Sequence, residues 1–303
     1  MKKYIITALC TLGSLNGMME EKQPLIIDRK PPREPREWPA QAYDEGNRRQ
    51  TSAFLHFLET NNIKVDGLDI LDVGCGTGTL SAIYASTAQH VHGFDASKNM
   101  IDFAQNKYGH IKNLSFEHCF AEDFKSEKLH QLALASFCIH WFEDKKQAFQ
   151  RINESLQPNS EFFAAVSTND IPKPLTLAVC LEMVEAIDWL RNIVSEKNLT
   201  DLTGASYPSQ EELSTMIKDA GFNILKCEEQ SFSYTIANRD ELKKVHWPII
   251  STRPIVKYIP DIRIQPFFEN FIDRVIEKLQ KNKDGSFDGI LRATIVHARK
   301  TQK

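Results

Sequence analysis

The stretch Leu-Asp-Val-Gly-Cys-Gly-Thr-Gly, residues 71–78, decides the fold. It ends an apolar run, residues 68–73, that is typical of a buried strand, and the pattern of a helix follows over residues 79–86. Glycines let the backbone turn sharply and come close to a ligand, and the first turn of a helix offers unpaired N–H groups. The stretch therefore predicts a ligand-binding turn between a strand and a helix.

The spacing of these glycines distinguishes between cofactors. A dinucleotide-binding loop has the pattern G-x-G-x-x-G, whose third glycine would fall at Thr79. The observed G-x-G-x-G, with Asp72 two residues ahead of it, is the pattern of S-adenosyl-L-methionine (SAM) binding instead. The next predicted strand, residues 90–95, ends in Asp95, where a carboxylate can accept hydrogen bonds from both ribose hydroxyls. We therefore predict SAM as the cofactor.

Strands and helices continue to alternate along the chain. Ser97 is placed to cap a helix that runs to about Lys107. We predict strands over residues 114–117, 132–139 and 161–167, and a helix over residues 145–156. Later come a helix from a capping box at Ser209–Glu212 to Gly221, strands over 223–236 and 286–298, and helical patches over 239–246 and 266–281. This order predicts an α/β fold with a Rossmann-like, doubly wound sheet.

The first 40 residues differ from the rest. Lys2 and Lys3 precede a modestly apolar stretch, residues 4–15, which has the outline of a signal peptide without a clear cleavage site. A disordered tail, or a chain that starts at Met18, explains it equally well. Residues 20–40 contain five prolines and many charges, and we interpret them as an extended arm. We expect a domain over residues 41–303 and a cytoplasmic protein, with export as the alternative.

Composition excludes several classes of protein. The 303 residues are 42% hydrophobic and 25% charged, as in ordinary globular proteins, and the net charge of −3 gives no reason to expect nucleic acid as a partner. No apolar run is long enough to cross a bilayer. The six cysteines are scattered, so we expect reduced core thiols and neither a metal site nor a disulfide framework.

Residues 43–168 resemble the class I SAM-dependent methyltransferases, whose fold is a seven-stranded sheet with an antiparallel last strand. By that resemblance Asp72, Gly74, Gly76 and Gly78 would line the methionine and ribose, and Asp95 would hold the ribose hydroxyls. Met100 would pack on adenine, although helical periodicity alone makes core packing an equal alternative. The family often has Gly-Asp-Ala after the third strand, where this chain has Cys119-Phe120-Ala121. Adenine recognition would then rest on the backbone of Ala121, or on Glu122 or Asp123.

The acceptor side is similar to small-molecule carboxyl methyltransferases of the juvenile hormone acid, trans-aconitate and malonyl-carrier type. The similar residues are the run Ser-Phe-Cys-Ile-His-Trp-Phe at 136–142 and the pair Tyr43-x6-Gln50. The resemblance places Tyr43 and Ser136 beside the cofactor and directs the N–H donors of Gln50 and Trp141 at an acceptor carboxylate. Trp141 is as readily explained by packing. His140 is either a general base for a hydroxyl or amine acceptor or a hydrogen-bonding residue at a strand end.

Two insertions, at about residues 170–205 and 238–283, are expected to form a helical cap over the carboxyl ends of the strands. The first contains a long apolar helix over residues 175–194, and the second contains Trp247, Tyr258, Phe267 and Phe268. If these side chains line the site, the acceptor is hydrophobic or long-chained; otherwise they simply pack against the sheet.

Three functions remain open at this point. The first is methylation of a small-molecule carboxylate. The second is O- or N-methylation of a protein, a quinone-like molecule or another substrate with His140 as base. The third is a catalytically silent SAM-fold partner subunit, against which the intact glycines and Asp95 argue.

Overall fold

The structure is a computed structural model that describes residues 37–170, 178–179, 182–183, 205–251 and 261–302. The predicted signal peptide, most of the arm and nearly all of the predicted helix at 175–194 lie outside these residues. The described helices and strands are α1 (Ala40–Gly46), α2 (Arg48–Thr60), β1 (Asp69–Val73), α3 (Thr79–Ala85), β2 (His90–Asp95), α4 (Lys98–Tyr108), β3 (Leu114–His118), β4 (His130–Ser136), η1 (Ile139–Trp141), α5 (Lys145–Glu154), β5 (Leu156–Val166), α9 (Gln210–Asp219), β6 (Phe222–Ile236), α10 (Arg239–Ser251), α11 (Asp261–Lys278), β7 (Gln280–Lys281) and β8 (Phe287–Lys300).

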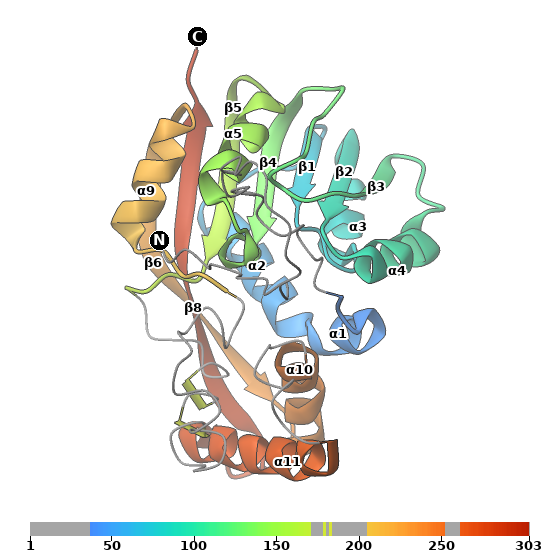
Figure 1. Cartoon of the computed structure of the whole chain (residues 1–303), viewed down its shortest axis with the longest axis vertical. Helices are drawn as coiled ribbons and strands as arrows, with labels where there is room; N and C mark the ends of the chain where they lie inside the picture. The colour runs from blue at the N-terminus through green and yellow to red at the C-terminus, as the bar shows by residue number, and fades with distance from the viewer. Residues whose placement is uncertain (1–36, 171–177, 180–181, 184–204, 252–260, 303) are drawn as a thin grey trace, which may run out of the picture. The chain divides into compact units, whose positions relative to one another are not determined.

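These strands form one sheet in the order β3-β2-β1-β4-β5-β8-β6, with the short β7 attached to β8 (Figure 1). The pairs among β1 to β5 are parallel, whereas β8 runs antiparallel to both of its long neighbours, β5 and β6. The predicted doubly wound α/β sheet with an antiparallel last strand is confirmed. The two-residue strand β7 was not expected; it leads into the turn before β8.

Strand residues alternate between two hydrophobic cores, one on each face of the sheet. In β4, Ala133 and Ala135 join a core with helices α5 and α9, while Leu132 and Leu134 join a core with α2 and α3. Both sets are completely or almost completely buried. Burial on both faces explains why the strand is an unbroken apolar run in the sequence. Packing on both faces holds the sheet in place, so the loops at the carboxyl ends of its strands start from a rigid base.

Strand β4 ends earlier than predicted. The apolar run continues to residue 139, but Phe137 adopts a left-handed backbone with φ of 52°, and its N–H donates to the carbonyl of Ala165 at 2.9 Å. A bulky residue in this region is strained and is held there by its surroundings. The turn redirects the chain into η1, which carries His140 and Trp141. Apolar composition alone could not predict this change of direction.

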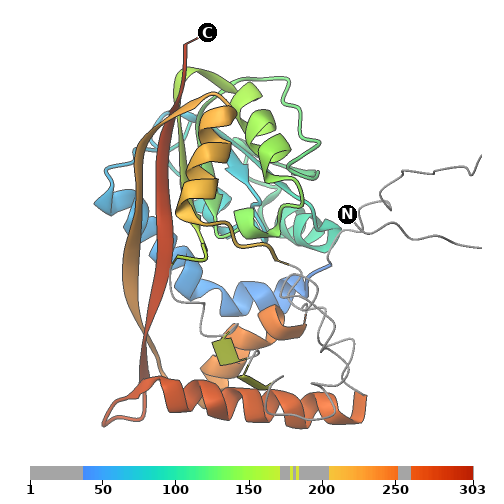
Figure 2. The same cartoon turned by 60° about the vertical axis from the view of Figure 1, so that its left-hand side comes forward.

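The paired strands β6 and β8 are longer than the rest of the sheet and support a third core. Helices α10 and α11 pack at the far end of these two strands (Figure 2). In this core Leu242, Phe271 and Ile272 are completely buried. Three aromatic residues expected in a cap, Trp247, Phe267 and Phe268, belong to this core; Tyr258 lies outside the described residues. These three side chains therefore hold the helical region together, and they give no reason to infer a long-chain acceptor.

The helical region contacts α1 closely. A side chain at Gly46 would meet the backbone carbonyl oxygen of Lys244 in α10 at 2.2 Å, so glycine allows these helices to pack.

No helix of the described residues has the length and hydropathy required to cross a membrane.

Candidate cofactor and acceptor site

The glycine loop and Asp95 form one hydrogen-bonded unit at the carboxyl edge of the sheet. Gly74, Gly76 and Gly78 have φ of 65°, 56° and 76°, values that residues with a side chain rarely adopt. One carboxylate oxygen of Asp95, Oδ2, accepts the N–H of Gly76 at 3.0 Å, and the other, Oδ1, accepts the N–H of Ser97 at 2.8 Å. A carboxylate has about four lone-pair sites, so each oxygen can still accept a further hydrogen bond.

Few atoms of the described residues lie in front of Gly76. Among those residues, a side chain built at Gly76 would have only the Tyr43 ring, at 3.9 Å, within contact range, whereas one at Gly74 would collide with Cys138 at 2.6 Å and one at Gly78 with Phe116 at 2.6 Å. Gly74 and Gly78 are thus required by packing, and Gly76 leaves bare backbone exposed beside the Asp95 carboxylate. This arrangement fits a ligand that carries a ribose, because vicinal hydroxyls can be held by one carboxylate.

Asp72 is a buried acid below the loop. Its side chain is 2% exposed and accepts the hydroxyl of Ser81 at 2.6 Å. Burial, with a smaller contribution from the Asp95 carboxylate, raises its pKa from 3.8 to about 7 despite the Ser81 hydrogen bond. Burial also raises the pKa of Asp95. Neither acid forms an ion pair with a lysine or arginine in the described part of the chain. A cationic ligand would compensate both, and this fits the positive charge of SAM.

Tyr43 links the loop to Gln50. Its ring faces Gly76, and its hydroxyl donates to the side-chain oxygen of Gln50 at 3.0 Å. Burial and the charge of Asp95 raise the Tyr43 pKa above its ordinary value, so this hydroxyl keeps the proton that it donates to Gln50. Because the oxygen of Gln50 accepts from Tyr43, the amide N–H groups are the part of Gln50 that can act on a ligand.

Trp38 joins this pair to the other side of the site. Its indole makes edge contacts with Tyr43, at 5.3 Å between ring centroids, and with Trp141 in η1, at 5.5 Å. The structure thus brings Gly76, Tyr43, Gln50 and Trp141 into one continuous set of contacts. Trp38 was missed in the sequence, where it belongs to the proline-rich arm and has no pattern that sets it apart.

His140 lies in the same short helix, and its ring contacts Trp141, with 4.8 Å between ring centroids, as well as a second aromatic residue. It is 7% exposed and stacks on Tyr207, with 5.3 Å between centroids and an interplanar angle of 12°. Its backbone carbonyl accepts the N–H of Ser206 at 2.8 Å. These contacts join residues 205–207 to η1.

The remaining predicted residues are distributed around the cofactor side. Met100 is buried in the first turn of α4, where its N–H donates to the capping hydroxyl of Ser97 at 3.4 Å. Ser136 is the half-buried last residue of β4. Ala121 is buried in the core with α5. The Glu122 carboxylate accepts the N–H groups of Glu143 and Asp144, at 2.9 and 3.1 Å, so it supports the turn before α5. We accordingly assign Glu122 a structural role in that turn.

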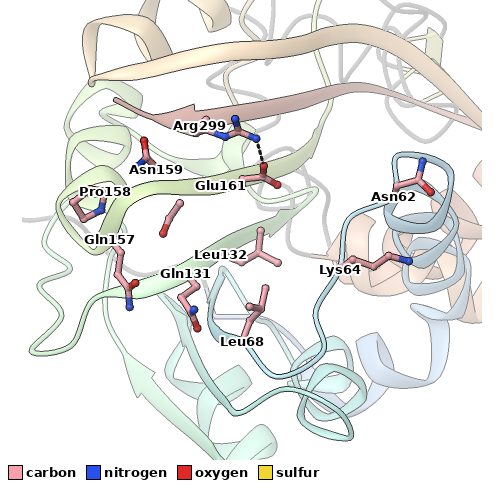
Figure 3. A pocket seen from close by; sticks show the side chains of 11 residues that line it. Asn62, Lys64, Leu68, Gln131, Leu132, Gln157, Pro158, Asn159, Glu161 and Arg299 are labelled. Carbon is pink, nitrogen blue, oxygen red and sulfur yellow. Dashed lines mark hydrogen bonds and ion pairs between the residues drawn. The ribbon is translucent and has the colours of Figure 1, made fainter. Parts of the chain in front are cut away.

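Two hollows of the described residues differ in their relation to this set. A small one between α1, α2 and α10 shares Tyr43 and Gln50 with it and is also lined by Asn47 and Arg49, among others. A larger one of about 520 Å³ lies at the opposite, amino edge of the sheet (Figure 3). Its polar side chains are used in the fold: Gln131 accepts the N–H of Asp69 at 3.0 Å, and Glu161 pairs with Arg299 at 2.7 Å. The amino-edge hollow is therefore not the cofactor site.

Comparison with known proteins agrees with this geometry. Residues 70–159 match a family model described as a methyltransferase domain. A ubiquinone biosynthesis O-methyltransferase of Aromatoleum aromaticum is 25% identical over 39% of this chain and 56% of its own length. A malonyl-[acyl-carrier protein] O-methyltransferase of Acetivibrio thermocellus is 25% identical over 38% of this chain and 41% of its own length. The chain thus spans about half the length of these curated relatives.

Among solved structures, the YcgJ protein of Bacillus subtilis has a similar fold, with a TM-score of 0.51 and 17% identity over 83% of this chain and 99% of that one. The match to the domain model, the sheet order and the loop geometry agree. The chain carries a class I SAM-dependent methyltransferase domain, and SAM is its cofactor.

Proposed function

Given this class I methyltransferase domain, we propose that the chain transfers the methyl group of SAM to a carboxylate of a small-molecule acceptor. The single observation that carries the proposal is the hydrogen bond from Tyr43 to the oxygen of Gln50. This bond engages the oxygen of Gln50 and leaves its amide N–H groups to act as donors, with Tyr43 lying between Gln50 and the half-buried backbone of Gly76. Neutral donors suit an anionic oxygen, and they do not neutralise its charge as a lysine or arginine would.

When bound, the cofactor supplies an electrophilic methyl group on a sulfonium. The protein then has to orient the acceptor, since a carboxylate is already ionised at neutral pH and needs no base. Gln50 and the indole N–H of Trp141 would hold one acceptor oxygen, and Trp38 and Tyr43 would exclude water around it. Catalysis of this kind consists mainly of in-line positioning and desolvation.

His140 would not be needed for this reaction. Its stacking on Tyr207 supports a structural role. Methylation of a hydroxyl or amine would instead require a proton acceptor at this position. The two reactions therefore differ in their dependence on one side chain.

The test is transfer from methyl-labelled SAM to a panel of fatty and dicarboxylic acids, with base-labile methyl esters as the readout. Gln50→Glu can still accept from Tyr43 but replaces the N–H donors with a negative charge. We expect it to lower kcat/KM by roughly tenfold to a hundredfold. Trp141→Phe should also lower it. His140→Phe, which preserves a ring against Tyr207, should retain most of the activity.

Two results would contradict the proposal. The first is esterification that Gln50→Glu leaves intact. The second is activity confined to hydroxyl or amine acceptors and abolished in His140→Phe, which would assign the base-dependent reaction instead.

A further inference from the structure

Residues 37–39, which we call the strap, precede α1 and contact both ends of the site. Their sequence, Glu-Trp-Pro, closes the proline-rich arm. Proline at position 39 fixes the backbone before the helix, and Tyr43 in α1 donates its N–H to the Pro39 carbonyl at 2.9 Å. The strap therefore leads into α1 with a defined backbone, and the side chains of Glu37 and Trp38 take defined directions from it.

Glu37 binds the start of α4. One of its carboxylate oxygens, Oε2, accepts the hydroxyl of Ser97 at 3.1 Å and the N–H of Asn99 at 3.1 Å. A carboxylate is favoured at a helix amino terminus because the terminal N–H groups and the helix dipole attract negative charge. Ser97 also donates its N–H to Asp95. Glu37 thus holds the strap beside the carboxylate that we assign to the ribose.

Trp38 lies at the acceptor end. Its edge contacts with Tyr43 and Trp141 place an indole between the residue that positions Gln50 and the second proposed donor. Aromatic contacts of this geometry contribute beyond simple burial. Removing Trp38 would take away a contact of both aromatic side chains and open the acceptor side to water.

We propose that the strap closes over the bound cofactor, with Glu37 as its latch and Trp38 as a wall of the acceptor site. The latch consists of two hydrogen bonds to one exposed carboxylate, so opening it breaks few contacts. A surface hollow of about 540 Å³ adjoins the strap along Trp38, Pro39 and Asn99. The strap has to open for the cofactor to leave. The role of Trp38 rests on the function proposed above; that of Glu37 rests only on the cofactor.

The latch is tested by the dissociation rate of S-adenosylhomocysteine, the demethylated product, measured by stopped-flow tryptophan fluorescence without any acceptor. Glu37→Ala should release it roughly tenfold faster than wild type, because hydrogen bonds to a charged group are lost. Glu37→Gln, which keeps acceptor oxygen, should fall between the two. Glu45→Ala is the matched control, since this acid is exposed on α1 and accepts only a 3.5 Å bond from Gln41.

The thermal midpoint of all three variants should stay close to that of wild type. Equal dissociation rates for wild type, Glu37→Ala and Glu45→Ala would overturn the latch, whether or not a carboxylate acceptor is found. Failure to find any methylated acid would count against the proposed function. The dissociation rates of S-adenosylhomocysteine would still test the latch, because they are measured without an acceptor.

The wall is tested in the active enzyme. Trp38→Ala should raise the acceptor KM and lower kcat, with little change in the equilibrium affinity for S-adenosylhomocysteine. Trp38→Phe should restore most of both constants because it retains a ring between Tyr43 and Trp141. Unchanged KM and kcat in Trp38→Ala would show that Trp38 is not part of the acceptor wall.

Discussion

Replacing Asp72 with asparagine should stabilise the cofactor-free protein at high pH while weakening SAM binding. Asp72 has a pKa of about 7 against an ordinary 3.8, since it is buried and faces Asp95. A difference of roughly 3 between the two pKa values corresponds to roughly 4 kcal/mol of folding free energy. The folded state binds a proton that the unfolded state has lost, so the stabilisation is complete below pH 3.8 and disappears as the pH rises through about 7.

Asp72→Asn has no proton to lose, and its amide oxygen can still accept from Ser81. At pH 8 the free energy of unfolding of the cofactor-free variant should exceed that of wild type by up to roughly 4 kcal/mol. At pH 5 the difference should shrink to roughly 1–2 kcal/mol, because wild-type Asp72 is then protonated in the folded state. Urea unfolding followed by intrinsic fluorescence at several pH values measures both quantities.

The same substitution removes a negative charge that the cationic cofactor would compensate. Asp72→Asn should therefore bind SAM more weakly, and wild-type affinity should rise between pH 6 and pH 8 as Asp72 ionises. A variant that is no more stable than wild type at pH 8, or a stability difference that does not depend on pH, would refute the interpretation of Asp72 as a strained, uncompensated acid.

Two further predictions concern packing and the amino edge of the sheet. In urea unfolding, Gly74→Ala should destabilise the fold by roughly 1–3 kcal/mol more than Gly67→Ala. Both glycines have positive φ, but of the two only Gly74 has a described side chain, that of Cys138, within contact range of an added methyl group. Equal losses of stability in the two variants would contradict this. Burial lowers the pKa values of His90 and His130, and His92 adds to the effect. Because the unfolded chain binds these protons more readily, the free energy of unfolding should be highest above about pH 6.5 and should decline as the pH falls below it. In His130→Gln the loss of urea-unfolding free energy between pH 7 and pH 5 should be smaller than in wild type, and an identical loss would show that His130 is not responsible.

Local sequence patterns predicted the parts of the fold that local physics determines. The glycine loop and the residue at the end of β2 were found because glycine spacing and strand periodicity are written in consecutive residues. The capping box at Ser209 was found for the same reason, and both of its hydrogen bonds are present. The early end of β4 was missed because Phe137 is forced into a left-handed turn by its surroundings, which the apolar run does not encode.

Contacts between distant segments could not be predicted in this way. Trp38 and Trp141 are about a hundred residues apart and meet only because the segment before α1 lies against η1 in the fold. Glu122 has a residue type suited to adenine recognition, and the structure adds a contact that the sequence does not reveal: one of its carboxylate oxygens binds the backbone before α5. Trp247 and Phe268, expected in a cap, contact each other within the α10–α11 core, with 4.9 Å between their ring centroids. Residue type indicates what a side chain can do, and the tertiary fold decides which of these roles it takes.

The central claim is that Asp95 and the backbone of Gly76 hold SAM, and calorimetric titration of the purified protein with SAM tests it most directly. Wild type should bind one equivalent with measurable heat, Asp95→Ala should give none at the same concentrations, and the control Asp102→Ala, an exposed acid of α4 paired with Lys98, should bind like wild type. A wild-type protein that takes up no SAM, or an Asp95→Ala variant that binds it equally well, would contradict the assignment of this site.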